Sequence, residues 1–256
     1  MAEHWLAHHP GTWKPRTLAT NTDLVKRRLA PLHALPIGQV TYEQVMRQLS
    51  AWTNDGLAYG TRKRSYAVLK AVLADAVRRD LLARNPCDKV AWKDETAPAK
   101  ARLTIPSSEE VERLISSLDE PWALLVELAA FTGLRAGEIA GLQKRHVNTA
   151  LRTVRVEQTV VDLDGSLSLG KPKSNAGYRD VDDLDPDLCQ RLAAHLAGKR
   201  GNDYVFGGQD VTGKPRPLSH RNFAKRVFQP AVQALGVSMR FHDLRHSTRA
   251  SCSTRG

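Results

Sequence analysis

Apolar residues recur every three or four positions through much of residues 1 to 92, which is the period of an amphipathic helix. A helix is expected from Asp23 to Leu29, and Thr41 begins a capping-box pattern (TYEQ) that opens another. The clearest helix is expected to start at Thr61 and to end before Asn85-Pro86. Its apolar positions are Leu69, Val72, Leu73, Ala76 and Val77. This part of the chain is predicted to form an entirely helical domain.

The apolar period disappears in residues 93 to 103, where charged residues mix with alanine and proline (KDETAPAKARL). We interpret this stretch as a linker between two domains. The second domain, residues 104 to 256, opens with another capping box at Ser107. Pro121 then begins a nearly all-apolar helix that Gly133 is expected to end. A helix without a polar face is predicted to be buried.

From Thr153 to Val161 the pattern changes to β-branched residues in partial alternation, which favours a strand. Asp164-Gly165 is a typical hairpin turn, and Tyr178 to Val181 is expected to add the third strand of one antiparallel meander. Later helices are expected to open at Asp185-Pro186 and Ser219. The predicted fold class is therefore mainly α with a small antiparallel β-sheet (α+β).

The charge of the chain fits a polyanionic partner, although the same balance would also keep a protein soluble. The formal net charge is +11 and the isoelectric point is about 9.8. Three cysteines without ligand-like spacing indicate reduced thiols inside a cell. The amino end is polar, and the most apolar stretch, Trp122 to Phe131, is too short to span a bilayer. A cytoplasmic protein is therefore expected.

Two motifs place arginines at turns beside apolar helix segments. The first is TGLRAGEIAGL, from Thr132 to Leu142, with Arg135 at a corner between two helices. The second is FHDLRH, from Phe241 to His246, with Arg245. A guanidinium that is held rigidly can donate two hydrogen bonds to one phosphate. The pair therefore indicates recognition of a phosphate group with several charged oxygens.

These motifs resemble the two signatures of the tyrosine recombinases, especially the phage-type integrases: T-G-L-R-x-x-E-x-x-x-L around Arg135 and H-x-L-R-H from His242. Between them, KPKSNAGYR (Lys171 to Arg179) is similar to the family's lysine-bearing β-hairpin. The resemblance covers nearly the whole chain. It implies that residues 1 to 92 are a helical core-binding domain for DNA and residues 104 to 256 an integrase-type catalytic domain.

The family cuts DNA by phosphoryl transfer without a metal or other cofactor, through a covalent phosphotyrosine. The resemblance implies that Arg135 and Arg245 clamp the non-bridging phosphate oxygens. Lys173 would protonate the leaving oxygen, although Lys171 could share that strand face. His242 would assist proton transfer or bond to the phosphate.

The resemblance also implies supporting residues. Glu138 would hold the corner that carries Arg135, Arg179 would contact phosphate, and His246 would be structural. His242 and His246 are also spaced like a zinc pair on a helix, but they lack the H-E-x-x-H arrangement and have a cation between them. No metal is expected, and the acidic residues form no sequence cluster that would support a metal-dependent nuclease.

Four basic residues lie near the start of the expected Thr61 helix: Arg62, Lys63, Arg64 and Lys70. A solvated helix face would explain them. The resemblance to a core-binding domain favours contacts to DNA phosphates, which set position rather than sequence choice.

The family pattern continues beyond the second motif with an apolar helix and, later, the nucleophilic tyrosine. Two average helices need roughly 25 residues, whereas ten follow His246. We therefore expect a catalytic domain that is truncated before the tyrosine and inactive as given. None of the tyrosines in the chain matches the family position; they are Tyr42, Tyr59, Tyr66, Tyr178 and Tyr204.

The sequence thus predicts a site-specific recombinase of the integrase type, from a phage or mobile element, that acts in DNA integration and recombination. The alternative is a non-catalytic DNA-binding protein that occupies an attachment site or competes with a full-length integrase. The expected partners are double-stranded DNA, further copies of this chain on DNA, and a full-length integrase. No membrane partner is expected.

Overall fold

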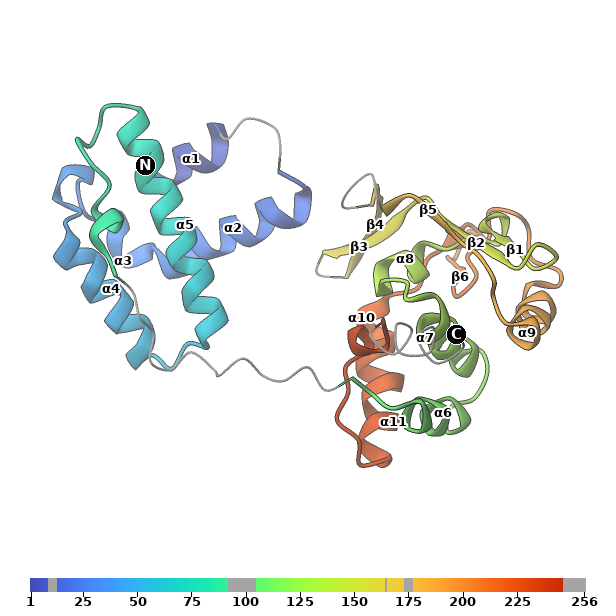
Figure 1. Cartoon of the computed structure of the whole chain (residues 1–256). Coiled ribbons are helices and arrows are strands. Elements are labelled where there is room, and N and C mark those ends of the chain that lie inside the picture. The colour runs from blue at the N-terminus through green and yellow to red at the C-terminus, as the bar shows by residue number, and fades with distance from the viewer. Residues whose placement is uncertain (9–12, 92–104, 164, 173–176, 246–256) are drawn as a thin grey trace. The chain divides into compact units, whose positions relative to one another are not determined.

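The computed structural model describes five stretches of the chain, namely residues 1–8, 13–91, 105–163, 165–172 and 177–245 (Figure 1). They belong to two compact units, Met1–Ala101 and Arg102–Gly256. Each unit has its own hydrophobic core.

The described residues of the first unit are helical. Its α-helices are α1 (Ala2–His8), α2 (Pro15–Arg28), α3 (Ala30–His33), α4 (Tyr42–Asn54) and α5 (Tyr59–Arg78), with 3₁₀ turns at Ile37–Gln39 and Pro86–Lys89. The cap predicted at Thr41 is confirmed, because its side chain accepts a hydrogen bond from the Gln44 N–H. Trp52 and Val25 lie in the core, and the Trp52 indole donates to the Arg28 carbonyl.

Two of the expected helices in this unit are present but begin earlier than the sequence pattern indicated. The helix expected from Asp23 begins at Pro15, where proline occupies the first helical position. The helix expected from Thr61 begins at Tyr59, and the Thr61 N–H already bonds to the Ala58 carbonyl within its first turn. Thr61 therefore lies inside the helix and cannot cap it.

The second unit combines helices with short antiparallel strands. Its α-helices are α6 (Ser108–Ser116), α7 (Trp122–Thr132), α8 (Ala136–Gly141), α9 (Pro186–Leu196), α10 (His220–Phe223) and α11 (Gln229–Ala234), and a π-helical turn (Ala224–Phe228) joins α10 to α11. Its strands are β1 (Val147–Asn148), β2 (Thr153–Val156), β3 (Thr159–Leu163), β4 (Ser166–Gly170), β5 (Arg179–Val181), β6 (Gly208–Gln209) and β7 (Pro215–Arg216). The predicted α+β fold class is confirmed.

The predicted helix ends in this unit are also confirmed. Ser107 forms a capping box with Glu110, and the side chains of Asp185 and Ser219 cap α9 and α10. Gly133 ends α7 in the left-handed conformation, with a φ of 60°. These signals depend on a few neighbouring residues, so they can be recognised without knowledge of the fold.

The predicted three-strand meander is wrong. The stretch from Thr153 to Val161 divides into β2 and the start of β3, which belong to different sheets. β2 pairs with β1 and β5, and Val154 lies opposite Val181. β3 and β4 form a separate hairpin in which Leu163 lies opposite Ser166. The local pattern identified strand-forming residues but could not determine their partners.

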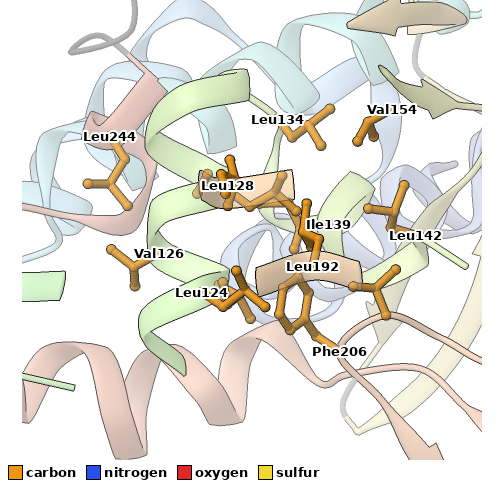
Figure 2. Close-up of a cluster of buried hydrophobic side chains, with 14 of the residues drawn as sticks. Leu124, Val126, Leu128, Leu134, Ile139, Leu142, Val154, Leu192, Phe206 and Leu244 are labelled. Atoms are coloured by element: carbon orange, nitrogen blue, oxygen red, sulfur yellow. The ribbon is translucent and has the colours of Figure 1, made fainter. Parts of the chain in front are cut away.

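The core of the second unit lies around α7 (Figure 2). Leu124 and Leu128 of this helix pack with Ile139 of α8, Val154 of β2 and Leu192 of α9. Further core residues shown there include Val126, Leu134, Leu142, Phe206 and Leu244. In the described parts of both units, none of the helices has the length and apolar character that a bilayer crossing needs.

Replacing Leu128 by alanine should destabilise the second unit by about 2–5 kcal/mol, because a buried side chain is removed and a cavity remains. Leu128 is 0% exposed, whereas Leu151 is 70% exposed. Leu151→Ala is therefore the matched control and should change the free energy of unfolding by no more than about 0.5 kcal/mol. Urea unfolding monitored by circular dichroism measures both, and equal effects would contradict the assigned core.

Candidate active site

Arg135 projects from the corner between α7 and α8. Gly133 reverses the chain after α7, and the next residue, Leu134, is buried in the core. Arg135 follows in an extended conformation as the residue that precedes α8. Its side chain is 46% exposed. The corner therefore buries the Leu134 side chain and leaves the Arg135 guanidinium accessible to solvent.

A single carboxylate holds this corner and a strand together. Glu138 is 3% exposed and accepts hydrogen bonds from the Arg135 backbone N–H (2.9 Å) and from Arg135 Nη1 (2.7 Å). Arg179 of β5 donates to the same carboxylate through Nη2, at 3.0 Å. Glu138 thus fixes Arg135 and connects it to the strand that follows the lysine-bearing segment.

The environment of Glu138 favours its ionised form. Burial alone would raise the pKa of this carboxyl group. Hydrogen bonds from Arg179 and Arg135 outweigh burial and hold the pKa below its usual value. Glu138 is therefore a carboxylate at neutral pH, and its charge strengthens both hydrogen bonds to the arginines.

α8 lies directly against β3 (Figure 1). A Cβ atom at Gly137 would be 2.6 Å from the Thr159 hydroxyl and 2.8 Å from the Val160 carbonyl oxygen, so only glycine fits here. One turn later, the Gln158 side chain donates to the Gly141 carbonyl at 2.7 Å. The glycines of the first motif thus let the helix that carries Glu138 pack onto the β3–β4 hairpin.

A small cavity connects the two arginine motifs. Its volume is about 130 Å³, and its lining includes Leu134 and Ala136, the two neighbours of Arg135. His242 and Arg245 of the second motif line the same cavity. The structure therefore brings the Arg135 corner beside His242 and Arg245, which are distant in the sequence.

The turn that carries His242 is anchored on both sides. Arg240 donates to the buried Asp243 carboxylate through its backbone N–H (2.8 Å), Nε (3.1 Å) and Nη2 (2.9 Å). These hydrogen bonds lower the pKa of Asp243. The next residue, Leu244, is 0% exposed and lies in the core, so Arg245 also follows a buried leucine. Neither arginine motif of the sequence indicated this Arg240–Asp243 pair.

One cavity residue was missed altogether. His220, the first residue of α10, lines the cavity with His242 and Arg245. Its only sequence signal is its position directly after the helix cap Ser219.

The remaining residues expected at the site are Lys173, its alternative Lys171, His246 and Arg179. Lys173 and His246 lie outside the described residues, and Lys171 is exposed. Arg179 was expected to contact phosphate, but its Nη2 donates to Glu138 and its Nη1 to the Gly177 carbonyl (3.4 Å). Both terminal nitrogens of this guanidinium therefore bond within the protein, which suits a positioning role better.

The basic residues of α5 do not form one exposed surface. The expectation for Arg62 needs correction: this residue is 4% exposed and lies among the buried residues of α5, whereas the expected contact with DNA requires an accessible guanidinium. Lys63 and Arg64 are exposed. Lys70 is also exposed and pairs with Asp88 at 3.1 Å.

The described residues contain no group of three or more His, Cys, Asp or Glu side chains arranged to hold a metal ion. Cys87 and Cys189 are buried free thiols. Desolvation by burial raises the pKa of Cys87 to about 11, which keeps it a neutral thiol at physiological pH.

Comparison with known proteins identifies related sequences. The model of the Phage integrase family matches residues 106–254. A protein named as a phiRv2 prophage integrase in Mycobacterium tuberculosis is 28% identical over 201 residues, which are 76% of this chain and 52% of that protein. The tyrosine recombinase XerC of a Mycobacterium species (strain KMS) is 31% identical over 226 residues, covering 82% of this chain and 69% of XerC. The chain thus spans about half the length of the first of these relatives.

Solved structures share the fold. The Tn1549 transposon integrase in complex with a circular intermediate DNA superposes with a TM-score of 0.80 at 18% identity, covering 100% of this chain and 88% of that one. A lambda integrase dimer bound to a core site gives a TM-score of 0.68 at 18% identity, covering 99% of this chain and 90% of that one.

Replacing Glu138 by glutamine should destabilise the second unit by about 1.5–3 kcal/mol at pH 7, because the variant cannot form charge-assisted hydrogen bonds to the two arginines. The folded-state pKa lies below the usual value of 4.5. The stabilisation is therefore complete above about pH 4.5 and disappears as pH falls through the lower folded pKa.

Urea unfolding between pH 3 and 7 measures this difference. Wild type and Glu138→Gln should converge in stability toward pH 3. Glu112→Gln, at an exposed position of α6, is the control and should remain close to wild type throughout. A constant difference between wild type and Glu138→Gln at every pH would contradict the ionised carboxylate.

Proposed function

Because this chain belongs to the phage integrase family, we propose that it binds duplex DNA and takes part in site-specific recombination by phosphoryl transfer. The observation that carries this proposal is the cavity shared by both arginine motifs, where His242 and Arg245 lie beside the neighbours of Arg135. The residues matched by the family model include all three.

In the proposed complex, the scissile phosphate binds at the mouth of this cavity. The guanidinium groups of Arg135 and Arg245 donate to the non-bridging oxygens, where negative charge increases in the transition state. His242 donates a further hydrogen bond or transfers a proton. Because both arginines follow buried leucines, the backbone that carries them is held in place before DNA binds, which reduces the cost of ordering it.

Three other residues complete the proposal. Glu138 positions Arg135, and Arg179 supports Glu138 from β5. Lys173 is proposed as the general acid for the leaving 5′ oxygen, on the strength of the hairpin motif alone. None of these steps requires a metal ion.

The proposed phosphoryl transfer also requires a tyrosine that attacks the phosphate. The lining of the cavity includes none of the five tyrosines. Tyr204 is buried, and burial raises the pKa of its hydroxyl, which disfavours a nucleophilic phenolate. Tyr178 is exposed beside Arg179. We propose that these 256 residues bind the phosphate but do not supply the nucleophile.

This arrangement supports a second candidate function, namely DNA binding without cleavage at an attachment site. A full-length integrase is then a proposed partner or competitor, since it would contribute its own tyrosine. We also propose that several copies assemble on DNA, by analogy with the lambda integrase dimer on its core site.

Replacing Lys63 and Arg64 together by alanine should weaken DNA binding and reduce the log–log salt slope by about 0.9 for each phosphate that is no longer neutralised, or about 1.8 for two phosphates. The assay is a binding titration across salt concentrations, with duplexes selected from a randomised pool for binding to this chain. Lys26→Ala with Arg27→Ala, two exposed residues of α2, removes the same charge and is the control. Equal slopes for both double variants would exclude a specific contact by α5.

The 256-residue chain should form no covalent adduct with a nicked version of the selected duplex, since no tyrosine lines the cavity. Denaturing electrophoresis detects such an adduct. Addition of a relative's catalytic segment that carries the tyrosine should produce one, and Arg135→Ala should abolish it. An adduct formed by the chain alone would overturn this proposal and direct attention to Tyr178 and Tyr204.

A further inference from the structure

One face of α10 extends the cavity beyond the two arginine motifs. His220 and Phe223 of α10 line it, and so does Ala224, the first residue of the π-helical turn that follows. Their spacing of three and four residues places their side chains on the same side of a helix. These three residues therefore form a continuous face, and His220 is its polar member at the start of α10.

Aromatic packing fixes this face against the second motif. The Phe223 ring meets the Phe241 ring edge to face, with centroids 5.7 Å apart. Phe241 also packs edge to face on Phe228, at 5.4 Å. Since Phe241 directly precedes His242, these contacts hold the imidazoles of His220 and His242 around one small space.

A buried carboxylate fixes the start of α10 from the other side. The Ser219 hydroxyl donates to Asp162 Oδ2 at 3.1 Å and accepts from the Asn222 N–H. The other oxygen of Asp162 accepts from the Gly165 N–H in the β3–β4 turn, at 2.9 Å. Asp162 is buried, and the hydrogen bond from Gly165 lowers its pKa. The residue before His220 is therefore held by an ionised side chain of the hairpin.

Three side chains of the cavity, His220, His242 and Arg245, carry groups that can bind a small anion. Its volume of about 130 Å³ corresponds to roughly four water molecules at ~30 Å³ each. Its walls are largely apolar, with Leu125, Ile139 and Leu218 among them, so the polar groups converge at a few points. Nδ1 of His220 and Nη1 of Arg245 are both shielded from solvent. In such surroundings a hydrogen bond to an anion is stronger than in water.

We propose that His220 is a further phosphate-binding residue of this site, which donates an imidazole N–H to the phosphate that Arg245 and His242 bind. The inference rests on the proposed function, and it adds a residue outside both arginine motifs. A neutral imidazole has one N–H to donate, so binding does not require a protonated ring. Asp162 and Ser219 act as positioning residues, because they hold the start of α10.

The test is a titration of the full chain, labelled with ¹⁵N at histidine, with inorganic phosphate at constant ionic strength. Long-range proton–nitrogen spectra report each imidazole ring, and His220→Gln and His242→Gln assign the two signals. The rings of His220 and His242 should respond with one common Kd. In His220→Gln the Kd reported by His242 should rise about tenfold, the effect expected from removing one hydrogen bond to a charged group.

His33→Gln is the matched control, because His33 is exposed and lies in the other unit. It should leave the Kd unchanged. A response of His242 without His220, or an unchanged Kd in His220→Gln, would overturn the inference and leave the proposed phosphate site intact. If neither ring signal changes when phosphate is added, the proposed phosphate site is wrong as well. If a variant folds poorly, the wild-type titration alone still separates a common response of two rings from a response of one ring and from no response.

Discussion

The shared carboxylate of Glu138 is the interaction on which the rest of the site depends. It is buried and charged, and such a group is stable only when hydrogen bonds replace its missing hydration. Arg135 and Arg179 supply these bonds from a helix corner and a strand. The requirement to satisfy one buried charge therefore holds two distant segments in a single arrangement. It also leaves the half-exposed Arg135 guanidinium with a fixed direction.

The hydrophobic core also restricts the positions of both candidate phosphate-binding arginines. Leu134 precedes Arg135 and Leu244 precedes Arg245, and both leucines lie in the core around α7 (Figure 2). Neighbouring side chains at a turn point in different directions, so burial of the leucine constrains where the arginine can go. Preorganisation of this kind matters for phosphate binding, because a flexible guanidinium would lose conformational entropy when it binds.

The β3–β4 hairpin is the common support of the surrounding elements. α8 approaches β3 closely at Gly137, and Asp162 of β3 holds Ser219 at the start of α10. The hairpin thus contacts the helix that carries Glu138 and the helix that carries His220. Two helices that line the cavity are therefore anchored on the same short hairpin.

The sequence by itself determined the features that depend on neighbouring residues. Ser107, Gly133 and Asp185 mark helix ends through contacts within one turn, and Arg135 and Arg245 belong to short motifs that can be recognised directly. Tertiary structure decided which strands pair, because β2 and β3 carry similar residues but join different sheets. It also turned Arg62 inward and brought His220 beside His242. Local pattern specifies the type of an element, whereas its partners depend on packing between residues far apart in the chain.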